Sequence, residues 1–326
     1  MVTRIIVKRT DEISDYLWKE IVDGFNESFG LNSSVEGFKN GWYIANPWGY
    51  AYHAMAFNEH DELMAYNVFT PAQYENGIKV VVSGSTFVRK RFRSNVMLFA
   101  DLIKALRERC AEDGFDLEVG VPNHNSLKYH IMINKVISVC DLSYYVLPIR
   151  LSRTIGKSLP RLIDILWSVA LKVLISFNQL LSRAANSKEE SRKYSIATGD
   201  TFNKTRFRNP EYQCVKYDNC TFVFRNYNEE DKRVAYLMDF RIAGIKSYKA
   251  LMIATRYILS NEDVDAILYI GFMHFKQWLM IKLPKRLVPK RLPLTCYVLN
   301  HKENELFQDI ADPDNWNFSL MSFDVR

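Results

Sequence analysis

The stretch from residue 78 to residue 130 constrains the fold of this chain more than any other part. Ile78–Phe87 is rich in β-branched residues and is long enough for a strand. A basic turn follows, and Val96–Cys110 then places apolar side chains at helical spacing. Phe115–Val121 has the pattern of a second strand, and another helix is expected directly after it. A strand, a helix and a second strand in this order form a βαβ unit, so the sequence predicts an α/β fold.

The turn Val88–Asn95 is the most basic part of this stretch, and it leads into the start of a helix. The first backbone N–H groups of a helix are free, and they form the positive end of the helix dipole. Arginine adds charge and bidentate contacts to phosphate. The turn therefore suits an anion such as a pyrophosphate, whereas the plainer interpretation is an ordinary βαβ turn with a solvated basic face. Its cations are Arg89, Lys90, Arg91 and Arg93.

The same stretch resembles the GNAT superfamily of acyltransferases, which bind acyl-coenzyme A. The signature loop of that family joins a strand to a helix and reads roughly Val-x-x-x-x-Arg/Gln-x-x-Gly-x-Gly/Ala. Val88 and Arg93 match its first two positions, and Val96 and Leu98 stand where the family has glycine or alanine. The resemblance implies that the loop holds the pyrophosphate of acetyl-CoA. The cofactor-binding residues that it implies in the loop are Val88, Arg89, Arg93, Ser94, Asn95 and Val96.

A second motif follows the next predicted strand. Pro122-Asn123-x-x-Ser126 is similar to the family's Asn-x-x-Ala/Ser, in which the asparagine contacts the arm of the cofactor. The resemblance therefore adds Asn123 and Ser126 to the cofactor site. The family's usual catalytic tyrosine lies seven residues after that asparagine. In this chain the position is His130, and Tyr129 precedes it.

Acyl transfer to an amine needs a base for the amine, polarisation of the thioester carbonyl and an acid for the departing thiolate. Tyr129 or His130 is the candidate acid, and Glu118, on the predicted second strand, is the candidate base if it faces the cleft. These residues also have a plainer interpretation. Glu118 is then an exposed strand residue, and Tyr129 and His130 are residues of a helix face. No zinc, Walker-type or dinucleotide motif competes with this assignment in the sequence.

Composition narrows the choice of partners and of compartment. The formal net charge of +6 suits an anionic ligand or a membrane surface, and it lacks the concentrated basicity of a nucleic-acid-binding protein. The five cysteines are scattered without a Cys-x-x-Cys pair, which favours reduced thiols over a disulfide or metal framework. The N-terminus has no apolar signal-peptide core. We therefore expect a cytoplasmic protein without a metal ion and without a nucleic-acid partner.

The residues before this stretch extend the predicted sheet. Arg4–Val7 reads as a strand, a helix then begins at Asp11 or Ser14, and residues 51–57 and 62–70 alternate as a hairpin. The loop-rich segment between them contains four aromatic residues. By the resemblance this segment covers the acceptor substrate, and the alternative is that its aromatic side chains pack on the edge of the core. The four are Phe38, Trp42, Tyr43 and Trp48.

The middle of the chain holds an apolar segment with cations on both sides. Leu162–Phe177 is interrupted only by Asp164 and Lys172, and it is too short and too charged for a membrane span. It is either a buried helix that joins two domains or an interfacial helix on an anionic leaflet. Peripheral membrane contact through residues 159–183 is therefore an open alternative. Residues 184–201 are polar and form the best linker candidate.

The second half of the chain repeats the order of the first. A hairpin is followed by the helix Ser247–Ser260, the strand Asp265–Phe272, a short helix at His274–Lys282 and a last strand at Leu294–Leu299. We therefore expect a tandem, diverged copy of the same domain. Its loop Arg241–Lys246 is a weaker counterpart of the basic turn. The expected boundaries are 1–149 for the first domain, 150–201 for the connecting helix and linker, and 202–326 for the second domain.

The sequence thus predicts a mixed α/β protein of two tandem GNAT-like domains, with helices on both faces of each sheet. The resemblance implies an N-acyltransferase that uses acetyl-CoA. Two-domain relatives with a Gly-x-Pro-Asn string resemble bacterial enzymes of surface-polysaccharide assembly, so an amino sugar or a nucleotide-linked amino sugar is the expected small-molecule acceptor. The alternatives are an aminoacyl transferase of the peptidoglycan-bridge type and a non-catalytic binding or scaffold protein that lost coenzyme A along with its loop glycines.

Overall fold

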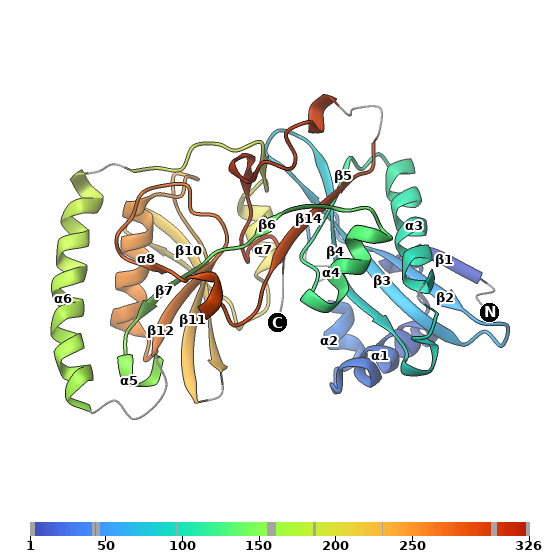
Figure 1. Ribbon diagram of the computed structural model, residues 1–326, viewed down its shortest axis with the longest axis horizontal. Helices are drawn as coiled ribbons and strands as arrows, with labels where there is room; N and C mark the ends of the chain where they lie inside the picture. Colours follow the sequence, from blue (N-terminus) through green and yellow to red (C-terminus); the bar gives the residue numbers. More distant parts are fainter. Residues whose placement is uncertain are drawn as a thin grey trace. The chain divides into compact units, whose positions relative to one another are not determined.

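The computed structural model divides into two compact units, each built on a β-sheet with helices against it (Figure 1). The first comprises Met1–Asp141, Ile196–Arg208 and Arg291–Asn315, and the second comprises Leu142–Ser195, Asn209–Lys290 and Trp316–Arg326. This division differs from the expected boundaries at residues 149 and 201, because neither unit is continuous in sequence. The structure describes residues 4–40, 43, 46–95, 97–154, 161–184, 187–229, 231–300 and 305–323.

The sheet of the first unit has seven strands in the order β1-β2-β3-β4-β5-β14-β6. Pairing is antiparallel except between β4 and β5, which run parallel and enclose α3 in the predicted βαβ unit. The elements of this unit are β1 (Arg4–Arg9), α1 (Asp15–Phe29), α2 (Val35–Asn40), β2 (Tyr52–Phe57), β3 (Leu63–Gln73), β4 (Lys79–Val88), α3 (Met97–Glu112), β5 (Leu117–Gly120), α4 (His124–Met132), β6 (Ile137–Asp141), α7 (Asp200–Arg206) and β14 (Pro293–Val298).

Helices cover both faces of this first sheet. Tyr52 and Ala54 of β2 pack with the buried face of α3, including Leu102 and Leu106. Met55, which alternates with them along the strand, packs in a separate cluster with α1. Successive strand residues point to opposite faces, so the two clusters form two cores, one on each side of the sheet.

The sheet of the second unit has six strands in the order β13-β7-β12-β11-β10-β9. α8 packs on this sheet, and α6 packs on α8 in turn. The elements of this unit are β7 (Tyr144–Pro148), α5 (Leu151–Thr154), α6 (Arg161–Ala184), β8 (Tyr194–Ser195), β9 (Gln213–Tyr217), β10 (Cys220–Glu229), β11 (Lys232–Ile242), α8 (Tyr248–Asn261), β12 (Ala266–Ile270), β13 (Ile281–Lys282) and β15 (Trp316–Asn317).

Each sheet is completed by one strand from the other half of the sequence. β14, near the end of the chain, lies between β5 and β6 of the first sheet. β7, from the expected first domain, lies between β12 and β13 of the second. The two copies of the predicted repeat have therefore exchanged a strand, which is why a cut at residue 149 does not separate them.

The expected short helix at His274–Lys282 is wrong. That segment is a loop that ends in β13. The side-chain oxygen of Gln277 accepts hydrogen bonds from the backbone N–H groups of Leu279 and Met280, at 2.8 Å each. A side chain that satisfies nearby backbone donors competes with helical hydrogen bonds, and apolar spacing does not reveal it.

Candidate active site

The two parallel strands of the first unit part from each other halfway along β4. They pair from Val80 with Leu117 to Ser83 with Gly120. β4 then continues to Val88 with β3 as its partner, whereas β5 ends at Gly120. Alternate backbone N–H and C=O groups of β4 beyond Ser83 are thereby released from the ladder with β5, and no other strand among the described residues pairs with β4 on that side.

A β-bulge lies in this released part of β4. The register between β3 and β4 shifts by one residue, which leaves Ser85 and Thr86 opposite Asn67. Ser85 has a φ of 43°, in the left-handed region. Thr86 Oγ1 donates to Asn67 Oδ1 at 2.8 Å, and Asn67 Nδ2 is buried without a hydrogen-bond partner among the described residues. Bulges redirect side chains and recur beside active sites.

A chain of hydrogen-bonded side chains leads from Ser85 into the core. The Tyr43 hydroxyl lies near the side chains of Ser85 and Tyr66, and both oppose the rise that burial causes in the pKa of Tyr43. The Tyr66 hydroxyl lies 2.7 Å from His53 Nδ1, and Thr10 Oγ1 lies 2.9 Å from His53 Nε2. All of these side chains except that of Ser85 are buried. The bulge is thus connected to an interior imidazole through two tyrosines.

Burial keeps this chain of side chains uncharged. It lowers the pKa of His53 to about 3 and raises the pKa of Tyr43 to about 12. It also raises the pKa of Tyr66. A neutral imidazole has one donor and one acceptor nitrogen, so the hydroxyl groups can all point toward His53 or all toward Ser85. In the first arrangement the Ser85 oxygen is an acceptor for a substrate N–H, and in the second its hydroxyl donates.

Sequence analysis missed this chain, although it placed Tyr43 in the segment expected to cover the acceptor. The hydroxyl groups come from different elements, so no local motif records them. One signal was available within the predicted hairpin. His53 pairs with Val68, which makes Tyr66 its diagonal neighbour across the two strands, and such neighbours are within reach of long side chains.

The basic turn before α3 is mostly engaged within the protein. Arg89 is bound to Glu20 at 3.0 Å and to Glu27 at 3.5 Å, both on α1. Arg91 pairs with Glu62. Arg93 Nε donates to the carbonyl of Val88, the last residue of β4, and its side chain is exposed. Among the described residues, Lys90 and Arg93 have no carboxylate partner, which leaves these two as the cations open to an anion.

The other residues implied in the loop stand at the start of α3. Ser94 and Asn95 are exposed, and the Asn95 carbonyl accepts a hydrogen bond from the N–H of Leu98 at 3.3 Å. The predicted Val96 lies outside the described residues. Asn123 and Ser126, implied as cofactor contacts, have a structural role at the start of α4. Asn123 Oδ1 accepts a hydrogen bond from the backbone N–H of Ser126 at 2.9 Å, which caps the helix.

The candidate acids on α4 differ in their exposure. The side chain of Tyr129 is 49% exposed. His130 is buried with its ring edge against Phe99. Burial, aided by the charge of Arg107, lowers the pKa of His130 to about 4, so its imidazole is neutral at physiological pH. Of the two, Tyr129 is the one that a ligand in solution can reach.

Glu118 is held by an ion pair within the first unit. Arg107 Nε donates to Glu118 Oε2 at 2.5 Å; the Glu118 side chain is buried, and that of Arg107 is 12% exposed. Arg107 also donates to the carbonyl of Asn134 at 2.6 Å and stacks on Tyr297, 3.5 Å from the ring centroid. Burial raises the pKa of Glu118, and Arg107 opposes that rise. A carboxylate engaged by a guanidinium in this way is poorly placed to act as the expected base.

A hollow of about 570 Å³ lies between α3 and the turn after α4. Met97 and Arg107 of α3 line the hollow together with Tyr297. Asn134 and Lys135, in the turn after α4, also line it. Its size is within the range of small-molecule sites. Met97 is the lining residue nearest in sequence to the basic turn, and no described residue of that turn lines the hollow.

The corresponding position in the second unit is filled by the protein itself. β11 and β12 pair in parallel at Val234–Tyr236, and β11 continues beyond that pairing to Ile242. The buried ammonium of Lys246 donates to the Tyr269 hydroxyl and to Asn317 Oδ1, at 3.0 Å each. Arg241 is likewise turned onto Asp239 at 2.9 Å. The weaker phosphate site expected at residues 241–246 therefore has both of its cations engaged inside the unit.

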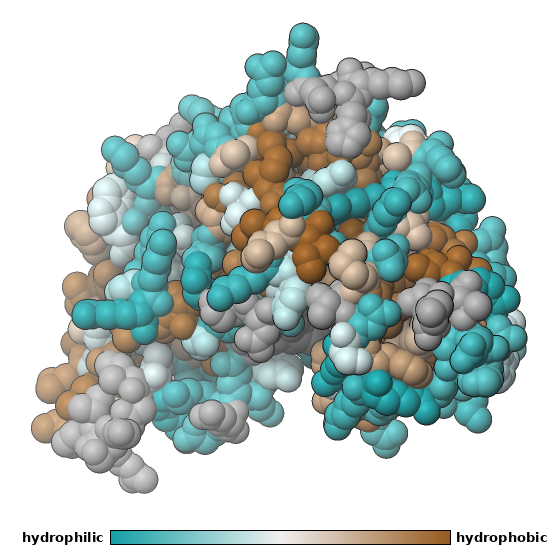
Figure 2. Space-filling view, turned by 45° about the vertical axis from the view of Figure 1, so that its right-hand side comes forward, coloured by the Kyte–Doolittle hydropathy of each residue, from teal (hydrophilic) through white to brown (hydrophobic). Residues whose placement is uncertain are grey.

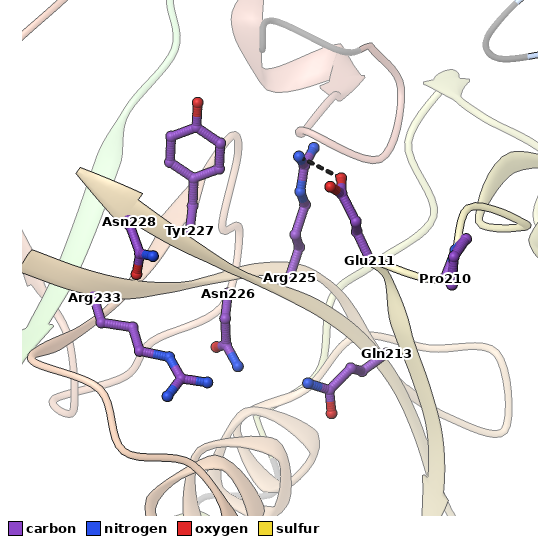
Figure 3. Close-up of a pocket in the computed structure, with 8 residues that line it drawn as sticks. All are labelled: Pro210, Glu211, Gln213, Arg225, Asn226, Tyr227, Asn228 and Arg233. Carbon is purple, nitrogen blue, oxygen red and sulfur yellow. Dashed lines mark ion pairs between the residues drawn. The ribbon is translucent and has the colours of Figure 1, made fainter. Parts of the chain in front are cut away.

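A second hollow, of about 480 Å³, lies over β9 and β10 of the second unit (Figure 3). Figure 3 shows Arg225 and Tyr227 on one side of the strand and Asn226 and Arg233 on the other. Arg225 pairs with Glu211 at 2.5 Å. Arg225, Asn226 and Tyr227 alternate along β10, and Arg233 on β11 points to the side of Asn226, so the four side chains do not converge on one ligand position. This hollow is therefore a weaker candidate than the region of the first unit.

The described residues contain no cluster of three or more His, Cys, Asp or Glu side chains arranged to hold a metal ion. All five cysteines are free thiols.

No family model matches the sequence, and no curated protein matches it. Solved structures do resemble the fold. A GCN5-related N-acetyltransferase from Anabaena variabilis is 10% identical with a TM-score of 0.57, and the match covers 91% of this chain and 73% of that one. A probable N-acyltransferase from Enterococcus faecalis is 11% identical with a TM-score of 0.56, covering 94% and 75%. Eis1 from Mycobacterium abscessus is 10% identical with a TM-score of 0.50, covering 91% and 74%.

These matches extend over both units of this chain. The chain therefore shares the fold of these GCN5-related N-acetyltransferases.

Proposed function

We propose that the first unit is an N-acyltransferase that transfers the acetyl group of acetyl-CoA to a small-molecule amine. The observation that carries the proposal is the β4 bulge at Ser85, where the strand leaves β5 and a buried hydroxyl chain ends. An amino sugar, free or nucleotide-linked, is the acceptor we favour, as in surface-polysaccharide assembly. The second unit then has a structural rather than a catalytic role. In the position that corresponds to the candidate site of the first unit, its Lys246 donates a hydrogen bond to Asn317.

The residues of the first unit fit a coenzyme A thioester in two respects. Arg93 and Lys90 are exposed beside the start of α3, and neither has a carboxylate partner among the described residues. Asn67 Nδ2 is a buried donor without a partner beside the bulge. Buried polar groups are normally satisfied, so an unpaired donor at this place favours an acceptor supplied by a ligand.

Bound acetyl-CoA would supply the thioester carbon that the amine attacks. The backbone N–H groups of β4 beyond Ser83 can donate to the carbonyl oxygen as negative charge develops on it. With its hydroxyl turned toward Tyr43, Ser85 presents an oxygen that accepts a hydrogen bond from the neutral amine and orients its lone pair toward the thioester carbon. The proton that the nitrogen loses after the attack passes to water, because the buried chain stays uncharged. Tyr129 is the exposed hydroxyl on α4 that can return a proton to the thiolate.

Replacing Ser85 with alanine should lower kcat by about a hundredfold, because the amine loses the hydrogen bond that orients it for attack. The affinity for acetyl-CoA should change by less than about twofold, since the proposed phosphate contacts remain. The measurement is release of free coenzyme A with a panel of amino sugars. Ser83→Ala, on the paired part of the same strand, is the matched control and should keep its kcat. A Ser85→Ala enzyme with unchanged kcat would remove Ser85 from the mechanism.

Binding tests the cofactor site separately from the chemistry. Titration calorimetry of acetyl-CoA into the intact protein should show saturable binding at about one site per chain. Arg93→Ala should weaken it about tenfold or more, as expected for loss of a charge-assisted contact to phosphate. Arg91→Ala, whose partner is Glu62, should have the smaller effect. Absence of binding at about millimolar acetyl-CoA would overturn the enzymatic proposal.

A further inference from the structure

α6 carries a row of exposed apolar side chains along its whole length. Seven of them recur on one side of the helix, and each is between 54% and 65% exposed. The row follows the left-hand edge of the molecule in Figure 2, where α6 lies, and brown atoms gather there. Single exposed apolar residues are ordinary, but a continuous row of this kind marks an interaction surface. Its members are Leu162, Ile165, Leu166, Val169, Val173, Phe177 and Leu180.

The opposite side of α6 is packed onto the second unit. Leu171 is buried in its core, together with the partly buried Trp167 and Leu174. Trp167 Nε1 donates to the carbonyl of Pro148 at 3.0 Å, and the Asn178 side chain accepts a hydrogen bond from the Tyr248 hydroxyl. The expected buried helix joining two domains is therefore not what the structure shows: one side of α6 is buried, and the whole helix belongs to the second unit. A helix held in this way keeps its apolar row at the surface.

The row has a basic border on one side. Lys172 and Arg183 lie on α6 beside it, and Arg256 reaches over from α8. With its amide oxygen turned toward them, Gln179 accepts hydrogen bonds from Arg256 at 2.8 Å and from Arg183 at 3.1 Å. α8 contains no acidic residue, and the one acid of α6, Asp164, is engaged by Ser152. The border is thus positively charged without a neutralising carboxylate among the described residues of these two helices.

Amphipathic helices that lie in a membrane interface combine the same features, an apolar side and a border of lysine and arginine. The helix continues past Phe177 to Ala184, so the expectation that the segment is too short for a membrane span is wrong: Leu162–Ala184 is long and apolar enough by length and composition. Crossing would require lipid on all sides, and the packing of Leu171 and the bonding of Asn178 on the core exclude that while the unit is folded. In a symmetric contact with a second copy, the basic border would be repeated on both partners with no acidic border to meet it.

We propose that the exposed row of α6 lies in the headgroup region of an anionic lipid membrane, with Lys172, Arg183 and Arg256 against the lipid phosphates. Trp278 supports this orientation. Its side chain is 55% exposed, and its backbone N–H donates to the same Tyr248 hydroxyl that binds Asn178, at 3.4 Å. Tryptophan is enriched at the level of the headgroups. The surface belongs to the second unit, so it stands apart from the proposed acyl transfer.

Flotation of the full-length protein with vesicles tests the proposal. We expect the protein to float with vesicles of phosphatidylcholine and phosphatidylglycerol, and much less with phosphatidylcholine alone. Binding should fade as salt is raised, because screening weakens attraction to the headgroups. Lys172→Glu should weaken binding about tenfold or more, and Lys216→Glu, an exposed lysine on β9, should not.

The apolar contribution is tested with a double variant, Val173→Gln with Leu180→Gln. Both side chains are 65% exposed, so the fold should tolerate the change, and vesicle binding should fall about tenfold or more. Ile245→Gln with Tyr217→Gln, two exposed apolar residues elsewhere in the same unit, is the control and should bind as the parent does. A protein that stays unbound with both vesicle types overturns the proposal. So does a dimer in sedimentation analysis that the α6 double variant converts to a monomer, because a second copy would then cover the row.

Discussion

Replacing Arg107 with alanine is expected to destabilise the protein by about 3–5 kcal/mol. The change leaves the carboxylate of Glu118 buried and removes the guanidinium that now binds it at 2.5 Å. It also removes the donor to the Asn134 carbonyl and the stacking on Tyr297. Removing one partner of a buried ion pair lowers the free energy of unfolding by more than the intact pair contributes to it, because the remaining charge is left desolvated and unpaired.

The loss of unfolding free energy in Arg107→Ala should depend on pH, because protonation of Glu118 removes its buried negative charge. The folded pKa of Glu118 is already raised by burial, and removing Arg107 raises it further. The destabilisation is therefore small below the carboxyl's ordinary pKa and grows as the pH rises above it. Urea unfolding at about pH 5 and about pH 7.5 measures the difference, and hydrogen exchange of β5 shows which unit is affected.

Arg109→Ala on the same helix is the matched control for this prediction. Its partner Asp113 lies 3.4 Å away, and the Arg109 side chain is 42% exposed. An exposed pair four residues apart contributes less than about 1 kcal/mol. A similar small loss for Arg107→Ala would contradict a structural role for the buried pair. It would also reopen the assignment of Glu118 as a base.

His53 is expected to make the protein acid-labile above the range in which carboxylates titrate. The unfolded chain binds a proton at a histidine near pH 6.5, whereas burial lowers the folded pKa of His53 to about 3. Stability from the neutral imidazole is therefore present above about pH 6.5 and is lost as the pH falls toward 3. The loss is about 2 kcal/mol between pH 7 and pH 5, and about 4 kcal/mol near pH 3.

Urea unfolding across this range, with His53→Gln as the variant, measures the effect. Glutamine keeps a donor and an acceptor near Thr10 and Tyr66 and cannot be protonated, so the unfolding free energy of the variant should fall less steeply between pH 7 and pH 5. His130 adds a similar slope, because burial lowers its pKa to about 4, and His130→Gln separates the two. His60→Gln, at an exposed turn, is the control. Equal slopes for His53→Gln and the parent protein would rule out His53 as the source.

Parts of the candidate site could be read from the sequence because they depend on neighbours in the chain. The strand, basic turn and helix around Val88 were predicted, and so was a helix directly after the second strand. What each side chain binds was not predictable in the same way. Arg89 was expected to hold phosphate and instead binds Glu20 and Glu27, because the two carboxylates on α1 lie far from it in sequence.

The sequence by itself determined the local elements of this protein. Ser14 was one of two expected starts for the first helix, and its side chain accepts from the N–H of Leu17. Hydrophobic spacing of two or about 3.6 residues and side-chain caps act over a few residues, so they are visible in the chain. The tertiary structure decided the exchange of β7 and β14, the hydroxyl chain from Ser85 to His53, and which side of α6 is covered. Each of these depends on partners distant in sequence, and their meeting is set by how the sheets and helices pack.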